Sequence, residues 1–425
     1  MYLKFKLIII FLSVQTLLFS QDLFDVEKIR DFKLSFYNAN WRQQLDLYKK
    51  KGTDQRVLAK LEVDGLEYDS VGVKFKGNSS YNAKFIKNPL NIKLDYKIKN
   101  QNLYGYKTLK LSNIFMDPSA IREVLAFGII GKYIPSPKAC FVQLFINDSI
   151  TGLYTNVEVV NKKLIKSFYT YKNGAFFKCE NTKRSSKPEN CNIAVSDGLT
   201  IGYTLDSNCY IYNYELQSKS GWNSLLNLMM TLWYNSDKST VYYQQIDKVL
   251  DIDKVMWMLA FNNLFVNLDS YNWSGRNYYM VEDSNKIFHP VMWDMNMCFG
   301  GFCHFYDADK LAEFPVYSCE NNIYRPLISK LFLVPTYKQL YINHYKTLLK
   351  NEILNGEFEL QALKLHKQIS PYITKDPYFY YQGKSFDNSL YQTYNNQIPG
   401  IIELMNNRIR YLKLQKDFKN LFTEN

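Results

Sequence analysis

Residues 262–272 read NNLFVNLDSYN and residues 292–296 read MWDMN, and these two acidic motifs set the expected order of elements around them. The apolar run before Asp269 predicts a helix that leads into a loop rich in carboxylate and amide side chains. The segment between the motifs, with RNYY at 276–279, predicts two short strands, the second of which ends at Asp294. This order can bring both Asp residues into one pocket with the amide of Asn272 or Asn277.

Two carboxylates and an amide oxygen are hard ligands that suit an octahedral Mg²⁺ ion and leave room for phosphates. Phosphoryl-transfer enzymes of the kinase type use one Asp to orient the attacking hydroxyl and a later Asp to hold metal. An Asp that follows a helix is also a common turn residue. The spacing alone therefore leaves a purely structural interpretation open.

The composition is that of a globular chain with a basic surface. Hydrophobic residues make up 47% of the 425 residues, and the formal net charge is +12. That charge favours the binding of polyanions such as nucleotide phosphates. No Lys/Arg-rich block or RNA-binding motif concentrates it, so nucleic acid is not an expected partner.

The N-terminus has the pattern of an export signal at residues 1–20. Lys4 and Lys6 precede an apolar run at 7–18, and Ser20 offers a small residue for cleavage. No later stretch reaches the roughly 18 apolar residues needed to cross a bilayer. We expect a mature protein without a transmembrane segment that is secreted, periplasmic or at the cell surface.

Seven cysteines fit such a compartment, and the odd number leaves at least one outside an intramolecular pair. Cys179 and Cys191, and likewise Cys298 and Cys303, are close enough in sequence to form a bridge, but the sequence leaves the connectivity open. His304 follows a cysteine, yet the chain has no CxxC pair, so a zinc cluster is not favoured.

The expected elements divide the mature chain into a β-rich part at 21–160 and a mainly helical part at 161–425. Expected strands lie at 57–63, 68–75, 90–94, 107–111, 141–146 and 151–159. Asp64-Gly65 and Asn147-Asp148 are the expected turns of two hairpins. Expected helices lie at 22–51, 117–133, 162–168, 224–233 and 251–268 and across most of 323–422. The helix at 251–268 is expected to begin with Asp251 and Asp253 as capping carboxylates. An irregular surface insertion is expected at 172–218. The order is that of an α+β, protein-kinase-like fold with two lobes.

Several short segments together resemble the CotH kinase family, the spore-coat-type atypical protein kinases. They occur in the family's order over about residues 22–300. They are VGVKFKGNSS at 71–80, IKLD at 92–95, IREVL at 121–125, IND at 146–148, GLY at 152–154 with Glu158, LD at 268–269, RNY at 276–278 and WDMN at 293–296.

The resemblance implies transfer of the ATP γ-phosphate to Ser or Thr of exported proteins, with Mg²⁺ or Mn²⁺ as cofactor. Asp269 then resembles the catalytic-loop Asp and Asp294 the metal-binding Asp. Asn277 is the expected second metal ligand, with Asn272 as the alternative. The family commonly has another Asp two residues after the Trp-Asp pair, where this chain has Asn296, an uncharged residue that weakens the case for a second metal.

The phosphates of ATP are expected to lie at a polar loop in the β-rich part. Gly77, Ser79 and Ser80 can contact phosphates with backbone N–H groups and hydroxyls. The expected phosphate-binding lysine is Lys93 or Lys76, and Lys74, on the same strand face as Lys76, could substitute. An exposed strand lysine remains the structural alternative.

The single helix of the β-rich part is expected to support that lysine. Glu123 can hold the lysine ammonium toward phosphate, and Arg122 can contact phosphate or the acidic loop, although both are also ordinary residues of a solvated helix face. Glu158 marks the expected hinge, where its backbone would bind adenine.

Two other functions fit parts of the sequence. Asp269 and Asp294 would also suit the paired carboxylates of a glycosidase, but the lysines and the Gly-Asn-Ser-Ser loop would then have no role. A CotH-like surface adhesion or interaction protein would keep the fold without catalysis, and Asn296 keeps this alternative open.

Overall fold

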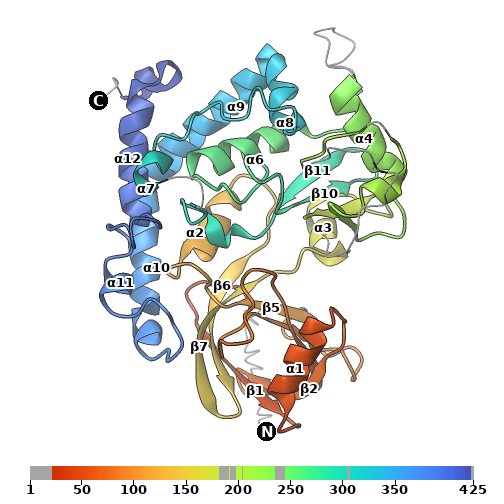
Figure 1. Ribbon diagram of the computed structural model, residues 1–425, viewed down its shortest axis with the longest axis vertical. Coiled ribbons are helices and arrows are strands. Elements are labelled where there is room, and N and C mark those ends of the chain that lie inside the picture. Colours follow the sequence, from red (N-terminus) through yellow and green to blue (C-terminus); the bar gives the residue numbers. More distant parts are fainter. Residues whose placement is uncertain are drawn as a thin grey trace, which may run out of the picture.

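The computed structural model describes residues 22–180, 191, 198–202, 204–234, 245–303 and 307–422. The expected export signal at 1–20 and His304 lie outside the described residues. A β-rich N-terminal part is followed by a mainly helical C-terminal part, which confirms the mixed α+β class. Figure 1 shows the strand-rich part at the bottom of the molecule and most of the helices above it.

The N-terminal part is a closed barrel of seven strands in the order β1-β2-β3-β4-β5-β7-β6. The strands are β1 (Arg30–Phe36), β2 (Val57–Val63), β3 (Leu66–Phe75), β4 (Leu90–Lys93), β5 (Thr108–Ser112), β6 (Ala139–Ile146) and β7 (Ser149–Val157). Neighbouring strands are antiparallel except β1 and β6, which pair in parallel. The sequence predicted a β-rich, kinase-like lobe here, and it did not predict that the strands close into a barrel.

Strand β1 is a correction, because the sequence predicted one helix over 22–51. Phe32 and Leu34 are buried while their neighbours are exposed, so this segment alternates like a strand with one face inside the barrel. Only the second half of the predicted helix forms, as α1 (Trp41–Lys50), which packs on the outside against β3.

Two-residue turns join the strand pairs that the sequence predicted as hairpins. Asp64-Gly65 connects β2 to β3, and Asn147-Asp148 connects β6 to β7. All four residues have positive φ, between 47° and 76°. Such turns match the right-handed twist of the flanking strands, which explains why the sequence located these hairpins correctly.

Helix α2 (Arg122–Ile130) lies between the barrel and the helical part, and every residue in it except Gly128 is buried. It begins five residues later than the expected start at Asp117. The Asp117 carboxylate nevertheless supports that start, because it accepts hydrogen bonds from the backbone N–H of Ser119 at 3.0 Å and of Arg122 at 2.9 Å.

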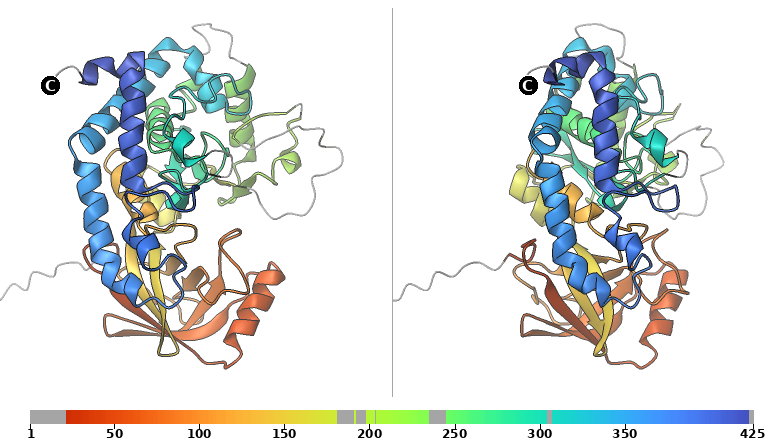
Figure 2. Two further views of the ribbon diagram at one scale, coloured as in Figure 1. Left: turned by 60° about the vertical axis from the view of Figure 1, so that its left-hand side comes forward. Right: turned by 90° about the vertical axis from the view of Figure 1, so that its left-hand side faces the viewer.

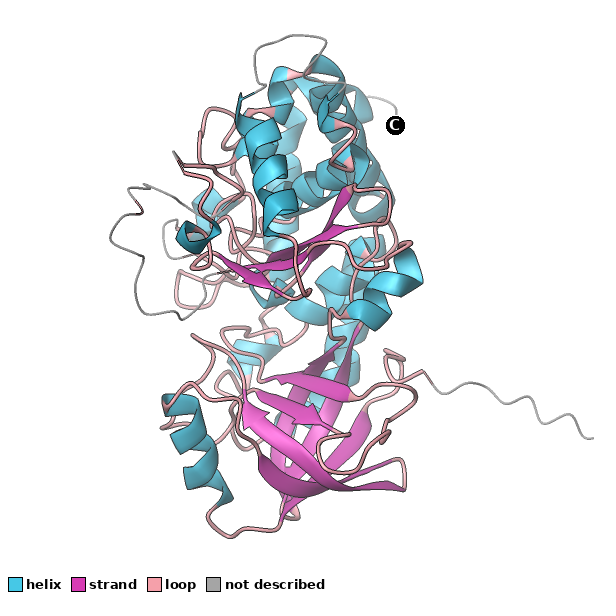
Figure 3. Cartoon of the chain, turned by 90° about the vertical axis from the view of Figure 1, so that its right-hand side faces the viewer, coloured by secondary structure: helices cyan, strands magenta, loops and turns pink. Residues whose placement is uncertain are grey.

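The C-terminal part contains a four-stranded antiparallel sheet in the order β11-β10-β8-β9, which Figure 3 shows in magenta among the helices. Its strands are β8 (Phe176–Cys179), β9 (Tyr214–Leu216), β10 (Tyr278–Glu282) and β11 (Phe288–Met292). The expected hairpin over 276–293 is confirmed. Strands β8 and β9 correct the expectation of an irregular insertion at 172–218, because that segment supplies half of this sheet.

The helices of this part are α3 (Lys162–Phe168), α4 (Trp222–Tyr234), α6 (Ile252–Leu264), α7 (Ala308–Leu311), α8 (Pro326–Ser329), α9 (Pro335–Leu348), α10 (Glu357–Thr374), α11 (Lys384–Asp387) and α12 (Ile401–Leu414). Asp251 caps α6 by accepting the N–H of Lys254, as expected. Figure 2 shows α10 running from the helical part down the side of the barrel. None of the described helices is both long and apolar enough to cross a membrane.

One disulfide joins Cys191 to Cys209. The pairing of Cys191 with Cys179, which the sequence left open, does not occur, because Cys191 is bonded to Cys209.

Candidate active site

A cavity of about 490 Å³ lies between the outer face of the barrel and the C-terminal sheet. The barrel contributes outward-facing residues of β3, β4 and β5, and the C-terminal part contributes the end of β8 and the two acidic loops. In β5 the buried Leu109 and Leu111 alternate with Lys110 and Ser112, which therefore face the cavity. The alternation of the strand itself directs polar side chains to this site.

A second cavity, of about 580 Å³, lies beside the C-terminal end of α2. Neither acidic motif lines it. The chemistry expected from the sequence therefore belongs to the first cavity.

The loop after β3 borders the first cavity with Gly77, Ser79 and Ser80. Gly77 has φ +77°, and a Cβ atom there would lie 2.2 Å from Ser80 Oγ. Both the backbone conformation and the close approach of Ser80 therefore favour glycine at this position. Lys49 of α1 donates a hydrogen bond to the Gly77 carbonyl.

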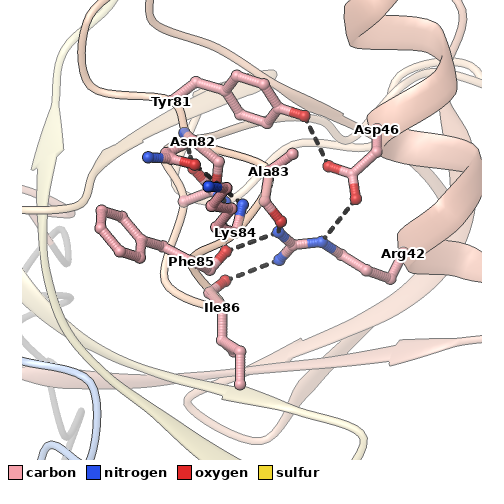
Figure 4. A network of polar contacts seen from close by, with 9 residues as sticks. Arg42, Asp46, Tyr81, Asn82, Ala83, Lys84, Phe85 and Ile86 are labelled. Carbon is pink, nitrogen blue, oxygen red and sulfur yellow. Dashed lines mark hydrogen bonds and ion pairs between the residues drawn. The ribbon is translucent and has the colours of Figure 1, made fainter.

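The continuation of this loop is held on α1 by one arginine (Figure 4). Arg42 donates hydrogen bonds to the carbonyls of Ala83 at 3.2 Å, Phe85 at 2.6 Å and Ile86 at 2.9 Å. The carboxylate of Asp46 accepts from Arg42 at 3.0 Å and from the Tyr81 hydroxyl at 2.7 Å. Helix α1 thus fixes the segment that follows the expected phosphate loop.

Lys76 lies at the cavity with the carboxylate expected to support it. Its Nζ donates to Ser112 Oγ at 2.9 Å. Burial lowers the pKa of Lys76, and the negative charges of Glu123 and Asp294 oppose that change. Burial raises the pKa of Glu123 to about 7, against the effect of the nearby Lys76 charge.

Lys93, the other expected phosphate lysine, is exposed on β4 and does not line the cavity. The structure therefore favours Lys76 between the two alternatives.

Asp269 lies in the loop after α6 and lines the same cavity as Asp294. Burial and then the charge of Asp294 raise the pKa of Asp269 to about 6. Burial disfavours the ionised form of Asp269, and the negative charge of Asp294 adds to that effect.

The two acidic loops are tied together by Asn277. Its side-chain amide donates to the backbone carbonyl of Asp269 at 2.7 Å, and its backbone carbonyl accepts the N–H of Trp293 at 3.2 Å. Asp294 follows directly, in the left-handed conformation with φ +57°. Asn277 lines the cavity, as does Asn296.

These residues fit a hard divalent cation. Asp269, Asp294, Asn277 and Asn296 line one cavity, and their side chains carry carboxylate and amide oxygens. Mg²⁺ is commonly held by one or two carboxylates, with phosphates and water completing its coordination. The described residues contain no cluster of three or more His, Cys, Asp or Glu side chains that could hold a metal, so the carboxylates alone would not complete a metal site.

Arg122 differs from the expectation of a phosphate contact, because its side chain is only 1% exposed. Its guanidinium donates to the carbonyls of Cys298 at 3.0 Å and Pro399 at 2.8 Å and pairs with Asp117. Arg122 therefore joins α2 to the segment after Asp294 and to the C-terminal part.

Asn272 and Glu158 also lie away from the cavity lining. Asn272 is 2% exposed and donates to the Leu259 carbonyl, so its side chain points into the protein core. The Glu158 N–H donates to the Lys138 carbonyl at 2.8 Å, and the Glu158 carboxylate accepts the Lys138 N–H at 3.1 Å. The N–H group of the backbone that was expected to bind adenine is thus engaged within the protein.

Some charged residues at the cavity did not emerge from the sequence. They are Lys49, Lys110, Lys178, Glu180 and Arg276. The alternation of TLKLS at 108–112 was a usable signal for Lys110, because it predicts a polar face on β5. Lys178 and Glu180 had no usable signal in the sequence, because β8 and the residue after it lie in the segment expected to be irregular.

Two carboxylates, two amides, a lysine and a glutamate line this cavity, and these are the residue types of a phosphoryl-transfer site. A family model described as CotH kinase protein matches residues 73–412, which is most of the chain. The chain therefore belongs to the CotH kinase family, as the short motifs had indicated. A search of curated proteins gave no match.

Proposed function

We propose that this protein is an exported protein kinase that transfers the γ-phosphate of ATP to Ser or Thr hydroxyls of other exported proteins. The observation that carries the proposal is that Asp269, Asp294, Lys76 and Glu123 all line one cavity. The Cys191–Cys209 disulfide supports an oxidising compartment outside the cytoplasm.

Each of these side chains has a role in the proposed reaction. Asp269 accepts the proton of the acceptor hydroxyl while the new oxygen–phosphorus bond forms and the bond to the ADP oxygen breaks. A carboxyl with a pKa of about 6 is mostly ionised at neutral pH and still basic enough to take a proton. Lys76, oriented by Ser112 and Glu123, contacts phosphate.

Asp294, Asn277 and Asn296 would hold the divalent metal, which neutralises phosphate charge when it is bound. Because phosphoryl transfer depends mainly on positioning and charge neutralisation, the loss of either Asp is expected to be severe.

A family member that keeps the fold without catalysis, as an adhesion or interaction protein, is the second candidate. Asn296 favours it, because this position contributes no negative charge for a second metal ion.

Transfer from labelled ATP to a Ser-rich acceptor, or to the protein itself, tests the proposal. Asp269→Asn is expected to retain MgATP binding and to lose about 100-fold or more of the transfer rate, the scale of a lost general base. Asp309→Asn, at an exposed carboxylate on α7, is the matched control and is expected to behave like the wild type. Equal rates in the wild type and Asp269→Asn would refute the kinase mechanism. Binding of MgATP without transfer to any acceptor would favour the adhesion protein.

A further inference from the structure

The outer face of the barrel presents two rows of side chains to the cavity. Lys74, Asn91 and Lys110 are directly paired across β3, β4 and β5. Lys76 and Ser112 lie two residues further along β3 and β5, and their side chains are joined by a hydrogen bond. Because adjacent strands are about 4.8 Å apart, the backbones of β3 and β5 are separated by about 10 Å on this face.

Lys110 is placed between the barrel and the second acidic loop. Its ammonium lies 4.3 Å from the centre of the Trp293 ring. Trp293 directly precedes Asp294, the proposed metal ligand. A cation over the indole face is favourable, because the face of the ring carries negative electrostatic potential. Trp293 thus positions Lys110 beside the carboxylate that would hold the phosphate-bound metal.

Two other lysines at the cavity, Lys76 and Lys178, already have polar or anionic partners. Lys76 donates to Ser112 and lies within the field of Glu123, and Lys178 pairs with Glu180. Lys110 makes no hydrogen bond or ion pair with any of the described residues, and beside its ring contact with Trp293 its ammonium can donate to a bound ligand. Burial, followed by the charges of Lys178 and Lys76, lowers the pKa of Lys110 to about 7. A nearby anionic ligand would accept hydrogen bonds from the Lys110 ammonium. Its negative charge would also offset the repulsion between Lys110 and the other two lysines.

We propose that Lys110 is a second phosphate-binding residue, which acts with Lys76 on the polyphosphate of the nucleotide and is positioned by Trp293. This inference rests on the proposed nucleotide-binding function and deepens it. In this arrangement Lys76, directly after β3, and Lys110, on β5, approach the polyphosphate from one face of the barrel. Asp294, which follows the Trp293 ring that contacts Lys110, would hold the metal.

Lys110→Met tests the proposal, because it keeps most of the side-chain stem and removes the charge. Calorimetric affinities for ATP, ADP and AMP are compared in the presence of Mg²⁺. We expect about a tenfold or greater loss for ATP, the scale of one lost charge-assisted hydrogen bond, and less than about a threefold loss for AMP. Lys110→Arg keeps the charge and is expected to retain more ATP affinity than Lys110→Met.

Lys93→Ala is the matched control, since Lys93 lies on the neighbouring strand β4 and outside the cavity lining. It is expected to bind all three nucleotides like the wild type. Thermal unfolding of the nucleotide-free protein supplies a second measurement. Lys110→Met is expected to unfold at the same or a higher temperature, because it removes a buried charge that lies among like charges.

The outcomes separate the two proposals. If the wild type binds MgATP and Lys110→Met binds it equally well, the role of Lys110 is refuted and the kinase proposal stands. An equal loss for AMP and ATP, or a lowered unfolding temperature with unchanged ATP affinity, would also refute it. If the wild type binds no nucleotide, the proposed function fails, and the role of Lys110 fails with it.

Discussion

Lys87 and Asp376 lie 289 residues apart in the chain and form a buried ion pair, with Nζ 2.5 Å from Oδ2. The side chains are 5% and 0% exposed. The same Asp376 oxygen accepts the N–H of Leu153 in β7 at 2.9 Å. One carboxylate therefore joins the segment after α10 to the barrel and to the end of the loop that borders the cavity.

Asp376→Ala is expected to lower the free energy of unfolding by about 3–5 kcal/mol, because it leaves the Lys87 ammonium buried without its partner. Urea unfolding at neutral pH measures this change. Lys364→Ala breaks an exposed ion pair with Glu27, at 50% and 65% exposure, and serves as the control with an expected effect of about 0–1 kcal/mol. Equal small effects of both substitutions would show that the buried pair does not hold the two parts together.

Asp269→Asn is expected to stabilise the metal-free protein at pH 7.5 and to leave its stability unchanged near pH 4. The folded state raises the pKa of Asp269 from 3.8 to about 6, so it binds the proton more tightly than the unfolded state does. The free energy of unfolding therefore falls as the pH rises through this range. A pKa difference of about 2 corresponds to about 3 kcal/mol, which is the upper limit of the gain.

Urea unfolding at both pH values, in the presence of a chelator, checks this expectation. Asp309→Asn, at an exposed position, should show no such pH-dependent difference. A wild type that is as stable as Asp269→Asn at pH 7.5 would contradict the electrostatic strain between Asp269 and Asp294.

Asp294→Ala is expected to abolish the dependence of ATP affinity on Mg²⁺, because it removes the main anchor of the proposed metal. Calorimetric titrations with ATP in Mg²⁺ and in a chelator should then give similar, weak affinities. Asn272→Ala removes an amide that the structure places outside the cavity lining, and it should keep the Mg²⁺ dependence of the wild type. A retained Mg²⁺ effect in Asp294→Ala would place the metal on other ligands.

Gly77→Ala is expected to weaken ATP binding and to cost about 1–2 kcal/mol of stability, because a side chain is unfavourable in the left-handed conformation. Its Cβ would also displace the Ser80 hydroxyl. Gly128→Ala is the control, since a Cβ at this exposed position on α2 meets no atom within 4 Å. It should raise stability by about 0.5–1 kcal/mol and leave ATP affinity unchanged. Unchanged ATP affinity in Gly77→Ala would remove this loop from the binding site.

The local elements that were predicted correctly depend on interactions within a few residues. The turn at Asp64-Gly65 and the cap at Asp251 each require only their neighbours in sequence, and both occur as expected. The helical prediction over 22–51 was wrong at Phe32 and Leu34, because their burial is set by pairing with β2 and with the distant β6. Strands β8 and β9 were missed for the same reason, since each is short and gains its stability from the completed sheet.

The sequence by itself determined the family and the α+β class. It also predicted that Asp269 and Asp294 share one pocket, because only a loop and one hairpin separate them in the chain. Only the tertiary structure decided which basic residues share their cavity. Lys93 and Lys110 lie on barrel strands and Lys76 directly follows one. The residues of the C-terminal part border the cavity beside Lys76 and Lys110, and Lys93 stays exposed outside its lining. Contacts between segments far apart in the chain make that choice, as they do for Lys87 and Asp376, and local sequence patterns do not encode them.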